Sequence, residues 1–293
     1  MKYIFVLGNM RSGTSWVSRV IAQSPIPLRY FEEPFVKLKR YPKTVCKEPW
    51  SVHINDSKKI KYYRNLLKTF ETDFGVFKKD VVGISVLQNS DNPEYFVIKE
   101  VHNIPAFRKI VDGLDCKIVF TSRNPFRVLD SNLHNFGDGL RIYMDEYIWL
   151  HKAVRGNIKI KDKCYLKALE SLNSATVDFI KEPIFNKDRY IQFFIVLLFN
   201  QRVLNYWDTE SENTYMIQYE ELCSDKITGF KNISDFIGFP FGDNVSDFLK
   251  NCSEVDNRKD PYSILRNKYL VGNAKYKFLT DEQIKVLGNF YGV

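Results

Sequence analysis

The chain has 293 residues, of which 44% are hydrophobic and 27% charged, a composition that excludes a disordered polymer and allows a large buried core. Lysine and arginine total 43 against 35 acidic residues, and the net charge of +8 indicates an anionic partner without identifying it. The longest apolar stretch, Ile191 to Phe199, is far shorter than the ~20 residues of a membrane span. We therefore expect a cytoplasmic protein with no stable membrane insertion.

Short apolar runs alternate with turns and helical stripes along the chain, and this order predicts an α/β fold. The expected strands cover residues 2–7, 27–31, 95–98, 117–121 and 215–219. The expected helices run from Thr14 to the Ser24-Pro25 stop, over 104–111, from Pro125, over 189–207 and 226–237, and from the Thr280 capping box to about residue 290.

The repeated order of strand, turn and helix predicts a parallel sheet with helices on both faces. No internal repeat or low-complexity linker is visible, so we expect a single domain over residues 1–293. Residues 136–188 are rich in Lys and Asp and interrupt the repeated order of strand, turn and helix. We interpret them as an insert on the acceptor side.

A glycine-flanked turn follows the first expected strand and precedes the first helix. Gly8 and Gly13 enclose four residues, which is the spacing and setting of a nucleotide phosphate loop. A nucleoside-triphosphate loop continues with Lys and then Ser or Thr, whereas here Thr14 and Ser15 follow, and Arg11 is the nearest cation. The turn predicts a P-loop-type three-layer sandwich with a central parallel sheet flanked by helices.

A second difference from phosphate-transferring enzymes concerns magnesium. Such enzymes end a neighbouring strand in an acidic residue that holds the metal. The strand at 117–121 ends in Ser122-Arg123 instead, and the four histidines and five cysteines show no metal-ligand spacing. The sequence therefore predicts a transferred group that needs no metal.

Arg123 and Ser131 form a second candidate anion site. Arg123 ends a strand, where open parallel sheets bind ligands, and Ser131 lies on the following helix on the same face as Asn124 and Val128. A guanidinium and a hydroxyl that converge on one point suit a phosphate. Two anion sites at one sheet edge fit a nucleotide that is phosphorylated at two positions.

These residues carry a family resemblance. Arg11 to Trp16 resembles the 5′-phosphosulfate loop of sulfotransferases that use 3′-phosphoadenosine 5′-phosphosulfate (PAPS), and Arg123-Asn124-Pro125 with Ser131 is similar to their 3′-phosphate motif. Two softer matches, at 219–222 and 236–240, follow in family order. Arg11 stands where cytosolic members carry lysine, so the loop looks closer to the bacterial and tyrosylprotein-like branch.

The resemblance implies that PAPS is the donor, that the sulfuryl group passes to a hydroxyl or amine, and that adenosine 3′,5′-bisphosphate (PAP) is released. It implies that Arg11 contacts the leaving phosphate and that Trp16 lies against the adenine. The donor-binding residues so implied are Arg11, Ser12, Gly13, Thr14, Ser15, Trp16, Arg123 and Ser131, and Arg258 is the nearest match to a basic motif near the C-terminus.

The resemblance implies that the base that removes the acceptor proton lies at the end of the second strand, where the tyrosylprotein branch carries its catalytic glutamate. Glu32 and Glu33 lie there, and if the chain stays extended only one of them points into the cleft. Counting from Arg11 favours Glu32, whereas Pro34 favours Glu33 by resemblance, because many bacterial members of the family read Glu-Pro.

Lys99, at the end of the third strand, is expected to assist the leaving group. Glu100 and His102 follow it, and both rank below the two glutamates as candidate bases.

Two other functions compete with sulfuryl transfer. A P-loop kinase-like phosphotransferase is disfavoured by the missing loop lysine and by the missing acid at the strand end. A binder of nucleic acid or another polyanion is disfavoured because acids interrupt every basic run. The acceptor, whether a small molecule, carbohydrate, lipid or peptide, has no motif in this sequence.

Overall fold

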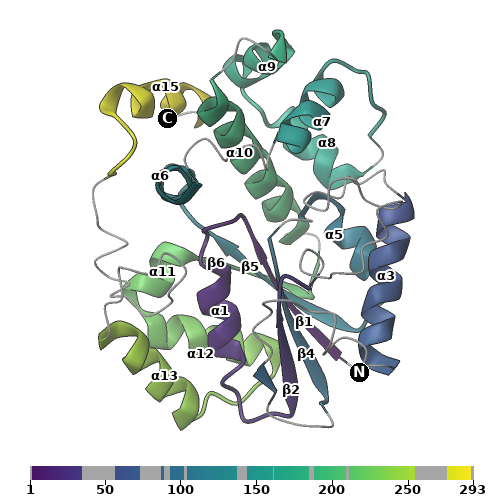
Figure 1. Ribbon diagram of the computed structural model, residues 1–293, viewed down its shortest axis with the longest axis vertical. Helices are drawn as coiled ribbons and strands as arrows, with labels where there is room; N and C mark the ends of the chain where they lie inside the picture. The colour runs from purple at the N-terminus through teal and green to yellow at the C-terminus, as the bar shows by residue number, and fades with distance from the viewer. Residues whose placement is uncertain are drawn as a thin grey trace. The chain divides into compact units, whose positions relative to one another are not determined.

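The computed structural model describes residues 2–34, 57–72, 87–88, 93–101, 104–136, 144–160, 162–184, 188–208, 211–254 and 276–291 (Figure 1). Two compact units divide the chain. The sheet unit comprises Met1–Ser122 and Glu212–Ala274, and the helical unit comprises Arg123–Ser211 and Lys275–Val293. The expectation of a single domain over 1–293 stays a prediction.

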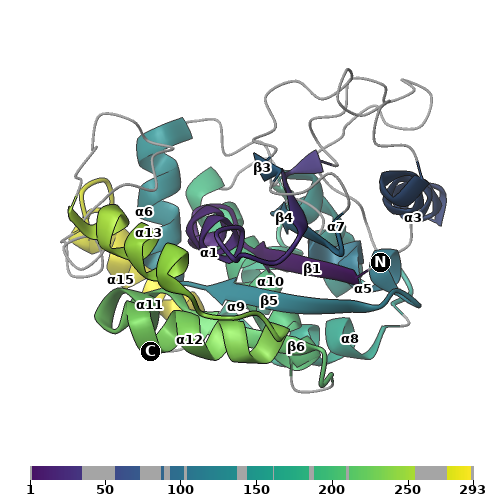
Figure 2. The ribbon, with the colours of Figure 1, turned by 90° about the horizontal axis from the view of Figure 1, so that it is seen from below.

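The sheet unit contains a central sheet in the order β3-β2-β4-β1-β5-β6 (Figure 2). Its strands are β1 (Lys2–Gly8), β2 (Leu28–Glu32), β3 (Leu87–Gln88), β4 (Tyr95–Glu100), β5 (Cys116–Ser122) and β6 (Thr214–Gln218). Every pairing is parallel except that of the two-residue β3 with β2. The predicted parallel sheet is confirmed, and β3 is an addition to it.

Side chains of β1 alternate between the two faces of the sheet and show how each face is covered. Ile4 and Val6 belong to the buried cluster that includes Trp16 of α1 (Thr14–Ile21) and residues of α12 (Lys226–Ile237) and α13 (Asp243–Glu254). On the other face, the Phe5 ring lies 4.9 Å from that of Phe107 in α5 (Ile104–Val111).

The second helix on this other face is α3 (Ser57–Thr72). The Tyr3 hydroxyl of β1 donates to the Leu67 carbonyl of α3 over 2.9 Å. Helices therefore cover both faces of the sheet, and the predicted three-layer α/β sandwich is confirmed for the sheet unit.

The helical unit contains α6 (Pro125–Phe136), α7 (Met144–Val154), α8 (Lys163–Glu170), α9 (Ser174–Lys181), α10 (Arg189–Asp208) and α15 (Asp281–Tyr291). Helix α10 is buried almost all around its middle turns, as its apolar run, which only Gln192 interrupts, predicts. The expected insert at 136–188 contains α7, α8 and α9, and its acceptor-side role is untested. No helix within the described ranges is long and apolar enough to cross a bilayer.

Side chains cap the starts of two helices. The Asn124 side chain accepts from the backbone N–H of Phe126 over 3.0 Å, with Pro125 as the first residue of α6. The Thr280 hydroxyl accepts from Gln283 N–H over 3.2 Å while the Gln283 side chain accepts from Thr280 N–H over 3.0 Å. This reciprocal pair confirms the capping box of α15.

One predicted boundary is wrong. Tyr219 was expected to end a strand, but it begins the short helix α11 (Tyr219–Ser224). Its ring is buried beside Gly13 and Trp16, so packing against the glycine loop decides the conformation there. The sequence of residues 215–219 carries no information about such a partner.

Candidate functional site

The phosphate-type loop is anchored between β1 and β5. Gly8, the last residue of β1, pairs with Thr121 of β5, and a Cβ at Gly8 would lie 2.4 Å from the Thr121 carbonyl oxygen. The buried Ser12 hydroxyl is 2.9 Å from the Thr121 hydroxyl, and Ser12 N–H donates to the Asn9 carbonyl over 3.0 Å. Glycine is therefore required at position 8, and the loop turns tightly over the end of β5.

Gly13 completes the loop and begins α1. It has φ +101° and lies so close to Tyr219 that a Cβ would fall 2.3 Å from a ring carbon. The Gly13 carbonyl accepts from Trp16 and Val17 N–H, so the first turn of α1 opens directly beyond the loop. A helix N-terminus in this position favours an anion, and the loop fits a phosphate group.

Arg11 also has a left-handed backbone, with φ +71°. Non-glycine residues rarely adopt this conformation, and those that do cluster at functional sites. The strained backbone is consistent with the expected contact between Arg11 and an anion.

Trp16 is more deeply buried than a residue that contacts a ligand needs to be. It is 2% exposed, and its ring centre lies 5.1 Å from Phe230 and 5.9 Å from Tyr219. Its contact with an adenine stays a prediction. Thr14 is likewise buried at the start of α1.

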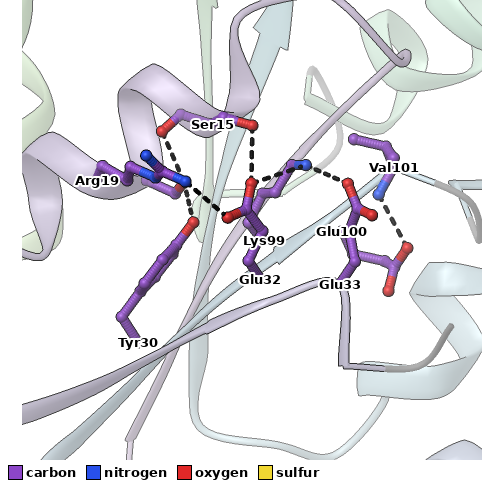
Figure 3. Close-up of polar contacts among 9 residues, drawn as sticks. Ser15, Arg19, Tyr30, Glu32, Glu33, Lys99, Glu100 and Val101 are labelled. Carbon is purple, nitrogen blue, oxygen red and sulfur yellow. Dashed lines mark hydrogen bonds and ion pairs between the residues drawn. The ribbon is translucent and has the colours of Figure 1, made fainter. Parts of the chain in front are cut away.

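A network of polar and charged side chains begins at Ser15, in the first turn of α1 (Figure 3). The Ser15 hydroxyl donates to Glu32 Oε1 over 3.0 Å, and Arg19 Nη2 donates to Glu32 Oε2 over 3.1 Å. Lys99 Nζ lies 3.5 Å from Glu32 Oε1, and Lys99 also pairs with Glu33. The phosphate-type loop and both candidate bases therefore meet in one connected cluster.

Tyr30 lies beneath this network. Its hydroxyl is 3.1 Å from the Ser18 hydroxyl. Burial, and then the negative charge of Glu32, raise the pKa of Tyr30 well above its usual value. Tyr30 therefore stays a neutral phenol at physiological pH.

The condition under which only one glutamate of the pair would point into the cleft is not met. That condition was an extended chain, but Glu33 has φ +53°, and its backbone N–H donates to the Lys99 carbonyl over 2.9 Å. The left-handed residue turns the chain back, so the Glu33 side chain reaches the same Lys99 as Glu32 does. Lys99 is 5% exposed.

Glu100 is fully buried, and its Oε1 accepts from Val101 N–H over 2.9 Å (Figure 3). His102 and Arg258 lie outside the described residues.

Arg123 and Ser131 belong to the helical unit, in which Arg123 directly follows β5 along the chain and Ser131 lies on α6. Both side chains are half-buried. Their shared role in holding a phosphate stays a prediction. No cluster of three or more His, Cys, Asp or Glu side chains suited to a metal occurs in the part of the chain that the structure describes.

Arg19 and Thr121 escaped the sequence analysis, and Tyr219 entered it only through the softer match at 219–222. Arg19 had a signal, because it follows Ser15 by four residues and therefore shares its helix face. Thr121 had none, and the contact of Tyr219 with Gly13 could not be predicted, since these contacts depend on the β1–β5 register and on the packing of α11.

A parallel sheet whose first strand leads through a glycine loop into a helix defines a nucleotide-binding α/β protein of the P-loop type. The model of the sulfotransferase domain family matches residues 2–291, so the chain belongs to that family and is a sulfotransferase.

Several solved structures are similar over most of their length. The sulfotransferase domain of the Synechococcus PCC 7002 olefin synthase is 14% identical, with 99% of this chain and 94% of that chain covered and a TM-score of 0.46. Mouse sulfotransferase SULT7A1 complexed with PAP is 14% identical, with 99% and 83% covered and a TM-score of 0.42. The sulfotransferase from Alicyclobacillus acidocaldarius is 16% identical, with 84% and 88% covered and a TM-score of 0.39.

These identities and TM-scores are low, so the family assignment rests on the match to the family model. A search of curated proteins gave no significant match.

Proposed function

We propose that this chain transfers the sulfuryl group of PAPS to an acceptor hydroxyl or amine and releases PAP. The observation that carries the proposal is the 3.0 Å hydrogen bond from Ser15, in the donor-type loop, to Glu32, in the carboxylate pair. It joins an anion-binding element to groups that suit proton removal, as a transfer from an anionic donor to a protic acceptor requires. The co-structures of mouse SULT7A1 and of retinol dehydratase with PAP support the choice of nucleotide.

The loop residues have the roles that the resemblance implies. Arg11, Ser12 and the N–H groups at the start of α1 stabilise the negative charge that grows on the leaving phosphate oxygen. Arg123 and Ser131 hold the 3′-phosphate. Arg11 in place of a lysine supports the bacterial or tyrosylprotein-like branch.

We assign the general base to Glu33. Ser15, Arg19 and Lys99 surround the Glu32 carboxylate, whereas Glu33 is the more exposed of the two, with 18% of its side chain accessible against 12%. During transfer the bond between sulfur and the phosphate oxygen breaks, the acceptor oxygen or nitrogen bonds to sulfur, and the acceptor proton passes to Glu33. Lys99, between the two carboxylates, holds Glu33 in place, and its expected assistance to the leaving group stays a prediction.

Nucleotide binding is the first test. PAP without magnesium should stabilise the chain by about 2.7 kcal/mol at 100 times its Kd, and should do so more strongly than ATP with magnesium. The reverse order would favour the kinase-like alternative. Arg123→Ala should weaken PAP binding, and unchanged binding would remove Arg123 from the site.

Transfer itself is the second arm of this test. Radiolabelled PAPS, incubated with an extract of the source cell, should label an acceptor, whose class (small molecule, carbohydrate, lipid or peptide) is then determined. Glu33→Gln should lower the rate about 100- to 10,000-fold, as loss of a general base does. A larger loss in Glu32→Gln than in Glu33→Gln would move the base to Glu32.

A cytoplasmic location belongs to the same proposal. The thiols of Cys116, Cys164 and Cys223 are unbridged, as in proteins of a reducing compartment. Fractionation of source cells with an antibody to the chain tests it, and recovery outside the cytoplasm would contradict it.

A further inference from the structure

We propose that Arg19 is a positioning residue for sulfuryl transfer, acting through Glu32 on Lys99 and Glu33. The inference rests on the proposed function and adds to it a residue outside the loop motif. Arg19 lies in the last turn of α1, between the donor-type loop and β2.

The first step is the geometry of α1. Ser15 and Arg19 are four residues apart, so they project from the same face of the helix. Each binds a different oxygen of one carboxylate: Ser15 binds Oε1 over 3.0 Å and Arg19 binds Oε2 over 3.1 Å (Figure 3). Glu32 is therefore held at two points, and its orientation relative to α1 is fixed.

The second step is the burial of the ion pair. The Arg19 side chain is 29% exposed and the Glu32 side chain 12%, so solvent screens the pair less than it screens a surface pair. The charge of Glu32 also raises the pKa of Arg19 against the lowering effect of burial. The guanidinium stays charged across the pH range of any assay.

The third step is the effect of the Glu32 orientation on Lys99 and Glu33. Lys99 Nζ lies 3.5 Å from the same Glu32 Oε1 that Ser15 binds, and it pairs with Glu33. Lys99 and Glu32 are register partners on β4 and β2, so their backbones are fixed by the sheet. When Arg19 is removed, Glu32 loses one of its two anchors on α1 and Lys99 loses a fixed counter-charge. Glu33, which depends on Lys99, then loses its position.

The test is a double-mutant cycle of Arg19→Gln and Glu32→Gln, read as the single-turnover rate of radiolabelled PAPS with water as acceptor and sulfate as product. Arg19→Gln should lower this rate by about 10- to 100-fold, because a misplacement of 1 Å costs up to about 100-fold. The PAP Kd should change less than threefold. The double variant should be no slower than Glu32→Gln alone, because Arg19 acts only through Glu32.

Two matched variants separate positioning from general damage. Arg19→Lys keeps the charge and should recover part of the rate, which a purely structural loss at Arg19 would not predict. Arg108→Ala removes an exposed arginine from α5, on the opposite face of the same sheet, and should leave rate and PAP Kd unchanged.

The outcomes are distinguishable. A wild-type chain that fails to bind PAP, or that neither releases sulfate nor labels an acceptor in the cell extract, overturns the proposed function. If the wild-type chain is active, two results overturn this inference alone. One is that the two single effects multiply in the double variant, and the other is that Arg19→Gln keeps the wild-type rate. A loss of PAP affinity equal to the loss of rate places Arg19 in donor binding and also overturns the inference.

Discussion

Gly13 is a position at which both the backbone conformation and the neighbouring side chain require glycine. Its φ of +101° disfavours any other residue, and a Cβ would lie 2.3 Å from the Tyr219 ring. We expect Gly13→Ala to lower the free energy of unfolding by about 1–3 kcal/mol, since a strained backbone position costs this much. PAP should no longer stabilise the variant, because the loop and the first turn of α1 must move apart from Tyr219.

Gly238→Ala is the matched control for this prediction. Gly238 caps α12 with φ +79°, but a Cβ there would meet nothing within 4 Å. It should cost about 1–2 kcal/mol for the left-handed backbone alone and leave PAP binding unchanged. Thermal denaturation with and without PAP checks both variants. Normal PAP binding by Gly13→Ala would show that the loop does not hold the donor.

At the residue scale, the sequence predicts the members of the site better than their contacts. Gly8, Gly13 and Arg11 could be singled out because a phosphate loop has a fixed spacing between a strand and a helix. The pairing of Lys99 with both Glu32 and Glu33 could not be predicted, because it depends on one left-handed residue at the end of β2. Nothing in Glu-Glu-Pro distinguishes that turn from an extended end.

At the scale of elements, local signals account for the predictions that are confirmed. Helix α5 spans Ile104–Val111 and α12 spans Lys226–Ile237, each as its apolar stripe and end residues predict. The inner strands are buried apolar runs and were predicted to within one or two residues. Helix α13, Asp243–Glu254, was missed because it buries little beyond Val245 and Leu249.

The start of α12 gives a prediction with a pH dependence. The Asp225 carboxylate accepts from Thr228 N–H over 3.1 Å. Hydrogen bonds from the Thr228 side chain, and then from its backbone, hold the pKa of Asp225 below its usual value. A carboxylate whose pKa is lowered by folding stabilises the folded state above its unfolded pKa of about 3.9, and this contribution is lost as the pH falls through the folded pKa.

Asp225→Ala should therefore lower the Tm at neutral pH, and the difference from wild type should shrink as the pH is lowered below about 4. Asp225→Asn is the control, because asparagine caps a helix without titrating. Its advantage over alanine should be the same at both pH values. A difference between wild type and Asp225→Ala that is constant with pH would show that the charge contributes nothing to the cap.

At the scale of the whole molecule, the net charge of +8 raises the question of which cations matter to function. The described lysines at 58, 61 and 68 are exposed along α3, where they are typical of a solvated helix face. Lys99, by contrast, is buried against two carboxylates. If the proposed function holds, donor affinity depends on a few positions such as Arg11 and Arg123, and the surface charge serves solubility.

Salt dependence distinguishes these two uses of charge. A surface that neutralises about 6–10 phosphates of a polyanion loses about 1,000- to 100,000-fold in affinity between about 50 and 200 mM salt. A small nucleotide held by few cations in a loop should lose less than about tenfold in affinity, because only screening of those cations changes.

Lys61→Glu should leave the PAP Kd within about twofold at either salt concentration, since exposed charges beyond about 10 Å are largely screened. Titration of PAP, and of a DNA duplex in parallel, measures both slopes. A steep slope for PAP, or a loss of affinity in Lys61→Glu as large as in Arg123→Ala, would mean that the basic surface itself binds the anion and that the loop does not select it.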